Sequence, residues 1–441
     1  MTLYGYSRQN ITPEFPVVMD GFAAREGMSV GVRDPLFVQA LALGDGVNTF
    51  LFVAMDLIGL DTALSERMRC AAQEGSGICS KQISLFSTHT HSGPAAGVLH
   101  GLYQDPRYWD KVENAMRVCT KKAVEQMRPC TLASAEVPLK LGVNRREFKD
   151  GRIQIGHNES LPCDRTLRAL CVKENGRVAG VLLNASCHLV TLSAENRRIS
   201  ADLLSVLYKS TNEIGCGGFA MFVNSAAGDI NPATDSGEDE EEALARCGHE
   251  LVKAATDAVR QAQQEPQAVF FCKETSIRIP VRVPDPQECR NAQEQYRRVL
   301  EHAESGVQRY VAEVFLDWYS SRRDAENFIT VKVRFYRLGN CAVLALPFEV
   351  FTVTRQTLLS AFREAGGDSA RLFICSCADG VRGYLPDAKA VREGGYEVEK
   401  APVWYGLPGF YTEESEPAVI AACRGMFACE KESAKEGGQN G

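Results

Sequence analysis

Several features that this sequence lacks exclude whole classes of protein. It has no run of the ~18 consecutive apolar residues that a membrane-spanning helix requires. Its N-terminus lacks the apolar core of a secretory signal peptide, and no block of Lys and Arg is present that would bind nucleic acid or an anionic membrane. The net charge of −7 and the pI near 5.7 agree with this. We therefore expect a cytoplasmic globular protein with no membrane span and no nucleic-acid partner.

The sixteen cysteines form no Cys-x-x-Cys pair, and the closest two are Cys375 and Cys377. In a long chain without a signal peptide this pattern favours reduced thiols, with disulfides or a thiolate zinc cluster as the weaker alternatives. Histidine is scarce, with seven residues in total. Two of the seven, His89 and His91, lie one residue apart in LFSTHTHSGPAAG, which makes this segment a candidate functional site.

Apolar runs alternate with turn signals and amphipathic segments along the chain. The runs at 36–43 and 49–61, joined by Gly-Asp-Gly, predict a pair of strands. Residues 62–75 and 106–128 have helical spacing, and the acidic run at 236–264 predicts a helix with acids in its first turn. Short apolar strands follow between these segments. The sequence thus predicts an α/β protein with mixed β-sheets flanked by helices.

No internal repeat or linker divides the chain, so residues 1–429 are predicted to form one domain. Residues 286–325 are highly charged and helical in pattern, which indicates an exposed helical excursion. This excursion is a possible docking surface for a second copy in a homo-oligomer. The tail at 430–441, EKESAKEGGQNG, is predicted to be disordered.

Polar residues follow several of the predicted apolar strands: His89 and His91 after SLFS, His188 after LLNASC, Asp229 after FVNSAAG, and Glu349 after LALPF. In α/β proteins, strand ends are where sites are assembled from distant parts of the sequence. The two histidines at 89 and 91 would point to the same side of a strand. Imidazole is a common zinc ligand, and a carboxylate as third ligand leaves an open position for water.

Spacing alone does not decide between a metal site and an ordinary core. A histidine or glutamate at the end of a strand is more often a hydrogen-bonded core or loop residue than a metal ligand. From the residues alone, both interpretations of His89, His188 and Glu349 stay open.

The motifs, taken in order, resemble those of the neutral (non-lysosomal) ceramidase family, whose catalytic domain is a zinc-dependent amidase. The most similar is THTHSGP at 88–94, and the resemblance extends over nearly all of residues 1–425. The other similar segments are GVNRR (142–146), CDRTLRALCV (163–172), ASCHLVTL (185–192), NSAAGDINP (224–232), PFEVFTVT (347–354) and DGVRGYLPDAKAVREGGYE (379–397).

Carried over to this chain, the resemblance implies a Zn²⁺ cofactor held by His89, His188, Glu349 and Tyr384. Such a site would lower the pKa of a bound water and polarise a carbonyl. Another divalent ion that prefers nitrogen and oxygen ligands remains an alternative to zinc.

The resemblance also places His91, Arg145 and Tyr396 at the reacting centre. His91 would carry a proton to the leaving nitrogen, while Arg145 and Tyr396 would stabilise the oxyanion. A structural ion pair for Arg145 and a packing role for Tyr384 or Tyr396 remain alternatives. Asp229 and Asn231 are predicted to contact the substrate.

The chain departs from the family pattern at GDINP, where Asn231 replaces the family serine. An amide cannot act as a nucleophile, so a mechanism that needs this serine is excluded. Secreted members also carry a C-terminal immunoglobulin-like domain, and we expect none in this chain because it ends soon after the last motif.

The sequence predicts a zinc-dependent hydrolase that cleaves a C–N amide bond of a small or polar substrate with a zinc-activated water. Ceramide itself, and with it a role in lipid metabolism, is the minority substrate assignment. Two alternatives stay open: hydrolysis of an ester, lactone or glycosidic bond on the same metal, and an inactive metal-binding scaffold.

Overall fold

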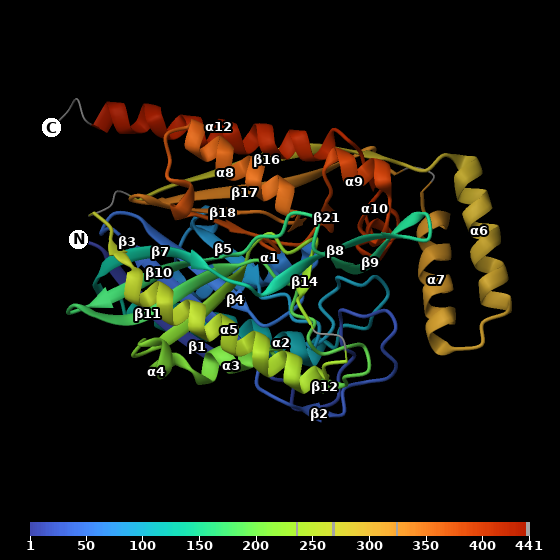
Figure 1. Cartoon of the computed structure of the whole chain (residues 1–441), viewed down its shortest axis with the longest axis horizontal. Helices are drawn as coiled ribbons and strands as arrows, with labels where there is room; N and C mark the ends of the chain where they lie inside the picture. The colour runs from blue at the N-terminus through green and yellow to red at the C-terminus, as the bar shows by residue number, and fades with distance from the viewer. Residues whose placement is uncertain (235–236, 267–269, 323–324, 438–441) are drawn as a thin grey trace.

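The computed structural model describes residues 1–234, 237–266, 270–322 and 325–437. It confirms the predicted mixed sheets flanked by helices (Figure 1).

Three five-stranded sheets form the body. In strand order, the first contains β5 (Ile83–Ser87), β4 (Thr49–Met55), β3 (Phe37–Gly44), β1 (Leu3–Asn10) and β6 (Arg128–Pro129). The second contains β13 (Phe219–Asn224), β11 (Arg177–Ala185), β10 (Thr166–Glu174), β7 (Thr131–Pro138) and β15 (Gln263–Gln264). The third contains β20 (Leu372–Cys375), β18 (Cys341–Ala345), β17 (Phe328–Leu338), β16 (Phe270–Arg282) and β22 (Phe410–Tyr411).

Each of these sheets has a pair of parallel strands at one edge, whereas its other pairs are antiparallel. The parallel pairs are β4 with β5, β11 with β13, and β18 with β20. Loops that leave the carboxyl ends of neighbouring parallel strands emerge at the same edge of a sheet, which is where α/β proteins build their sites. The fold therefore offers three such edges.

Buried amides join these three edges. The side-chain amide of Asn224, at the end of β13, donates to the carbonyls of Thr88 and Cys187, and the backbone carbonyl of Asn224 accepts from the N–H of Ser376. Asn184 of β11 donates to the carbonyl of Ile374 in β20. Because buried amides need partners, these bonds fix how the edges meet.

An apolar cluster lies where the three sheets face one another. It includes Leu41 of the first sheet, Leu170 and Met221 of the second, and Tyr336 and Val343 of the third, all almost fully buried. The hydroxyl of Tyr336 lies 2.9 Å from the Ser84 hydroxyl of β5, which satisfies its polar end and ties the third sheet to the first.

Helices cover the outer faces. The first sheet carries α1 (Thr62–Ser76) and α2 (Pro106–Glu125), which pack on each other. The second carries α3 (Leu204–Lys209), α4 (Thr211–Ile214) and α5 (Glu240–Gln261), and the third carries α8 (Thr352–Glu364) and α12 (Ser415–Gly437). Asp239 caps α5 ahead of three glutamates in its first turn, as the acidic run predicts.

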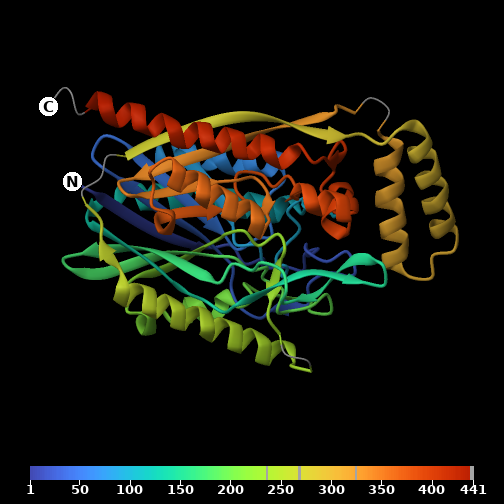
Figure 2. The same ribbon diagram turned by 45° about the horizontal axis from the view of Figure 1, so that its top comes forward.

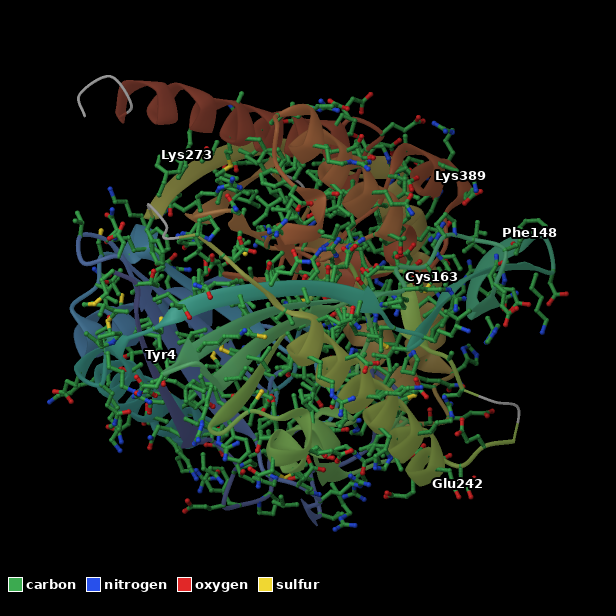
Figure 3. All side chains as sticks on the ribbon, turned by 60° about the vertical axis from the view of Figure 1, so that its left-hand side comes forward. Tyr4, Phe148, Cys163, Glu242, Lys273 and Lys389 are labelled. Carbon is green, nitrogen blue, oxygen red and sulfur yellow. The ribbon has the colours of Figure 1, made fainter. Side chains whose placement is uncertain are left out.

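Shorter elements lie near the sheet edges. A three-stranded sheet contains β14 (Ile230–Pro232), β8 (Gly142–Lys149) and β9 (Arg152–Asn158), in that order. Two strand pairs are formed by β19 (Glu349–Val350) with β21 (Tyr384–Leu385), and by β12 (Arg198–Ile199) with β2 (Gly31–Val32). The short helices are α9 (Ala388–Glu393), α10 (Tyr396–Glu399), α11 (Ala401–Trp404) and two single-turn 3₁₀ helices at Ser80–Gln82 and Ser369–Arg371. Figure 3 shows Phe148 at the outer end of the β8–β9 hairpin, where its side chain is 70% exposed.

The predicted helical excursion is confirmed as a hairpin of α6 (Pro286–Glu301) and α7 (Gly306–Ser320), which stands off from the sheets (Figure 2). No residue of α6 is buried. The inner helix α7 packs through Phe315 and Trp318 on Leu99, Val403 and Trp404. The hairpin thus contacts the loop after THTHSGP and the segment after Tyr396.

Three further features concern the C-terminal tail, the cysteines and the apolarity of the helices. The helix α12 extends to Gly437, and residues 438–441 lie outside the described residues, so the disorder of the tail at 430–441 stays a prediction. Every cysteine from Cys70 to Cys423 is a free thiol. Within the described ranges, no helix has the length and apolarity needed to cross a membrane.

We predict that Asp379→Asn destabilises the fold strongly. Asp379, at a positive φ of 54°, has a side chain only 3% exposed and pairs with two buried arginines, Arg69 and Arg334. Removing the carboxylate leaves Arg69 without an acidic partner among the described residues and Arg334 with Glu274 alone, which costs about 3 kcal/mol of unfolding free energy in urea denaturation. The control Asp110→Asn breaks an exposed pair with Arg67 and costs less than about 1 kcal/mol. Equal effects of the two variants would contradict this role.

Candidate metal centre

Three histidine side chains converge at the meeting point of the sheet edges. One ring nitrogen each of His89, His91 and His188 lies within 4.8 Å of the others, and all three residues are buried. The Nε2 atoms of His89 and His91 are 3.3 Å apart. The sequence prediction brought these residues together correctly, although they come from two different sheets.

The reason given for the direction of His89 and His91 was wrong. The two histidines were expected on the same side of a strand, but they do not lie on that strand. The strand β5 ends at Ser87, and His89 has a φ of +74°. This turn is held by the N–H of His89, which donates to the carbonyl of Leu57 in the loop after β4, and by a bridge between Thr90 and Leu189. A left-handed residue, uncommon outside glycine, thus aims the imidazole.

Backbone carbonyls orient all three rings. The Nδ1 atom of His89 lies 2.6 Å from the carbonyl of Ile58, that of His91 lies 3.0 Å from the carbonyl of Gly21, and that of His188 lies 2.7 Å from the carbonyl of Ala227. A carbonyl can only accept, so each Nδ1 carries the hydrogen. Each Nε2 is then the atom that faces the centre and can bind a metal.

Glu349 supplies a carboxylate oxygen to the same point. Its Oε2 lies 3.2 Å from Nε2 of His89 and 3.0 Å from Nε2 of His188. This buried oxygen has no hydrogen-bond donor among the described residues. The other oxygen, Oε1, accepts a hydrogen bond from the hydroxyl of Tyr405.

Tyr384 lies beside Glu349, because the two residues are partners in the parallel pair β19–β21. Its hydroxyl oxygen is 3.5 Å from Nε2 of His188. Glu349 and Tyr384 follow β18 and β20, so the third sheet contributes both of its residues through one parallel pair.

Arg145 reaches the centre from β8. Its Nη1 lies 3.2 Å from Nε2 of His188 and 3.3 Å from the side-chain oxygen of Asn231, and its Nε donates to Glu397 at 3.0 Å. The Nη2 atom is buried and has no partner among the described residues. The predicted ion pair of Arg145 exists, and one donor group remains free.

The other predicted residues lie at differing distances from the metal point. The ring of Tyr396 is 6.0 Å from that of Tyr384, and Asn231 is joined to the centre through Arg145. Asp229 is 4% exposed, and both of its oxygens are occupied: Oδ1 accepts from Thr352 and Oδ2 from Asn144. Asp229 thus supports the backbone around the site in this structure, and its contact with substrate stays a prediction.

The electrostatics favour a cation at the centre. Burial lowers the pKa of His188 to about 4, and burial together with the charges of His89 and His188 holds the pKa of His91 well below its usual value. Burial acts in the opposite direction on Glu349, yet the histidines hold its pKa well below the usual range. Two neutral imidazoles therefore face an ionised carboxylate.

His89 differs from the other two histidines. Burial lowers the pKa of His89, but its interactions with the Cys377 side chain and with the carboxylate of Glu349 outweigh burial and raise this pKa well above its usual value. A proton on His89 then compensates Glu349 when no cation is present. A metal ion would take the place of this proton, since metal binding to histidine displaces protons.

The spacing of these atoms fits a tetrahedral ion. Ligand atoms at the usual distances from a tetrahedral zinc are separated from one another by roughly 3.3 Å. The measured separations between Nε2 and Oε2 atoms are 3.0 to 3.3 Å, and the one that involves Tyr384 is 3.5 Å. Both His91 and Tyr384 have this spacing to a neighbouring ligand, so either could complete a set of four.

Two residues of this centre escaped the sequence prediction. Glu397 is 1% exposed and pairs with both Arg145 and Arg146, and Tyr405 holds Glu349. The sequence did contain a signal for Glu397. It directly follows Tyr396 in DGVRGYLPDAKAVREGGYE, and the two adjacent arginines of GVNRR need acidic partners if they are buried. Nothing in the sequence around Tyr405 points to the site.

The first 263 residues match one family model, described as the N-terminal part of neutral/alkaline non-lysosomal ceramidase, over residues 3–263. The chain belongs to this family. Ceramidases of Drosophila pseudoobscura pseudoobscura and Drosophila melanogaster, both called neutral ceramidase, are each 24% identical to it over 254 residues, which is 52% of this chain and 36% of theirs. The chain thus spans about a third of the length of these curated relatives.

The fold of this ceramidase-family chain agrees with that assignment. The crystal structure of neutral ceramidase from Pseudomonas aeruginosa superposes with a TM-score of 0.76 at 17% identity, over 98% of this chain and 75% of that one. A ceramidase solved in complex with C2 gives the same TM-score at 15% identity and the same coverage. At such low identity the likeness establishes the fold.

We predict that the stability difference between wild type and Asp229→Asn depends on pH. Burial raises the pKa of Asp229 to about 6, above the value of about 3.9 in the unfolded chain. The folded state therefore holds its proton more tightly, and this contribution is complete below about pH 4 and lost as the pH rises through about 6.

Urea denaturation of both proteins from pH 4 to pH 7 measures this effect. The difference in unfolding free energy should shift in favour of the asparagine variant by up to about 3 kcal/mol over this range. Other titrating groups are common to both proteins and cancel. A difference independent of pH would show that Asp229 is ionised throughout.

Proposed function

We propose that this chain is a metal-dependent hydrolase of C–N amide bonds, with zinc as its ion. The observation that carries the proposal is the set of inward-facing acceptors: three Nε2 atoms and the unpartnered Oε2 of Glu349 around one buried point. Without a cation, a proton on His89 offsets the charge of Glu349, and a divalent ion would replace this proton and bind these atoms together. Family membership supports the reaction type.

His89, His188, Glu349 and Tyr384 would hold the ion, as the family resemblance implies. A divalent ion held there lowers the pKa of a coordinated water and polarises a substrate carbonyl. Segments that follow strands of all three large sheets supply this set, and the carbonyl bonds to Nδ1 hold the imidazoles in the tautomer required.

His91 is placed to move a proton. Its Nδ1 is committed to the carbonyl of Gly21, its Nε2 faces the centre, and its lowered pKa leaves it neutral at neutral pH. A neutral imidazole can accept a proton from the attacking water and deliver it to the leaving nitrogen. The ring of Phe22, 5.1 Å from the ring of His91, screens its outer side.

Arg145 would stabilise negative charge on the substrate oxygen. Its Nη2 is buried, unpartnered and attached to a guanidinium whose other nitrogens hold Glu397, Asn231 and His188. A preorganised donor of this kind acts when charge develops on the oxyanion. The Tyr396 hydroxyl is a second candidate donor, and Asn231 a polar contact for the substrate.

We propose that the substrate is a small or polar amide. Ceramide, the substrate in the family's name, is the alternative to be tested. The groups next to the predicted ligands, Arg145 and Asn231, are polar and suit such a molecule. The rates at which the protein hydrolyses a short polar N-acyl amide and ceramides with short and long acyl chains should be compared. The substrate that is hydrolysed fastest decides the substrate class.

We predict about one zinc ion per chain in the wild type. Mass spectrometric metal analysis should find this zinc lost in His188→Ala and retained in the control His157→Ala, because His157 lies on β9 with a side chain 49% exposed. Circular dichroism must show all three proteins folded. A wild type that takes up no metal when zinc is supplied would refute the proposed site.

His91→Gln distinguishes a proton carrier from a ligand. If His91 carries a proton and does not bind the metal, the variant should keep its zinc. Its kcat for an N-acyl amide should then fall by about 10²- to 10⁴-fold. Loss of zinc in this variant would instead make His91 a ligand. Retained zinc and unchanged kcat would assign it neither role.

A further inference from the structure

Tyr405, directly after α11, contacts both residues that the third sheet contributes to the centre. Its hydroxyl donates to Oε1 of Glu349. Its ring lies 6.1 Å from the ring of Tyr384, nearly perpendicular to it at 88°. Because Glu349 and Tyr384 are paired across β19 and β21, one tyrosine touches both members of this pair.

The hydrogen bond decides which oxygen of Glu349 faces the imidazoles. The last torsion of a glutamate side chain is broad and nearly two-fold, so nothing within the residue fixes the carboxylate plane. With Oε1 held by Tyr405, Oε2 is the oxygen 3.0 Å from His188 and 3.2 Å from His89. Oε1 is thereby turned away from the centre.

The position of Tyr405 is fixed from two sides. On one side lies Gly383, at a φ of +74°, where an added Cβ would be 3.4 Å from the tyrosine ring, an ordinary van der Waals contact. On the other side, α7 packs on Trp404, and the indole N–H of Trp318 donates to the carbonyl of Leu407 at 2.7 Å. The segment that carries Tyr405 is therefore anchored by the α6–α7 hairpin.

We infer that Tyr405 is a positioning residue that holds Glu349 for binding of the divalent ion through one oxygen. This inference rests on the proposed metal site and adds to it a group that does not touch the metal. Partners of this kind orient a ligand and raise its affinity for the ion, and their removal typically costs 10- to 100-fold. Without the hydroxyl, the carboxylate is free to rotate and bind through both oxygens.

The test uses Tyr405→Phe, which keeps the ring and removes only the hydroxyl. The matched control is Tyr4→Phe, because the buried Tyr4 also donates to a carboxylate, Oε2 of Glu174 at 2.8 Å, on a different part of the molecule (Figure 3). Zinc affinity is measured by competition with a chromogenic chelator. The visible spectrum of the cobalt-loaded proteins reports coordination number, since four-coordinate cobalt absorbs more strongly than five- or six-coordinate cobalt.

We expect zinc affinity to fall about 10- to 100-fold in Tyr405→Phe and to stay at the wild-type value in Tyr4→Phe. The cobalt absorption should weaken only in Tyr405→Phe. Unchanged affinity and an unchanged cobalt spectrum in Tyr405→Phe would overturn the inference and leave the metal site standing. A wild type that binds no metal would instead refute the proposed function, and the inference with it.

Thermal unfolding separates positioning from a loss of structure. Zinc raises the melting temperature in proportion to its affinity for the folded state. A positioning role predicts a smaller zinc-induced rise in Tyr405→Phe, with the metal-free melting temperature close to that of wild type. A lower metal-free melting temperature with an undiminished zinc-induced rise would mean that the hydroxyl only stabilises the fold.

Discussion

The centre depends on one constraint, which is that every histidine in it gives its Nδ1 hydrogen to a backbone carbonyl. These bonds select the tautomer and set the plane of each ring, so that three Nε2 atoms meet at one buried point. Backbone carbonyls move only if the loops move. The geometry of the centre is therefore set by the loops after β1, β4 and β13, which carry these carbonyls, rather than by the histidine side chains themselves.

Those loops lie together because of the sheet topology. Each large sheet places its one parallel pair at an edge, and Asn184 and Asn224 join the three edges through buried amide bonds. An antiparallel hairpin would return its chain to the opposite end of the sheet. Parallel pairs instead deliver two loops to the same end, and the segments that follow three such pairs carry the three histidines, Glu349 and Tyr384.

The sequence predicted much of this arrangement. Apolar periodicity and turn residues located the helices at 62–75 and 106–128 and the charged hairpin at 286–325, because those signals are local. Motif resemblance located His89, His188, Glu349 and Tyr384. The left-handed turn at His89 could not be foreseen, since the N–H of His89 is held by the carbonyl of Leu57 in the loop after β4. Tyr405 was missed for the same reason: its role exists only once α11 packs beside β19.

The order of the centre's residues along the chain has a consequence for synthesis. The imidazoles at 89, 91 and 188 are made early, whereas Glu349 and Tyr384 belong to the last sheet and Tyr405 follows it. A chain emerging from the ribosome thus carries its nitrogen donors long before the carboxylate that completes them exists. The centre is finished only when the third sheet has been translated and docked, so its completion marks a chain in which all three large sheets have come together.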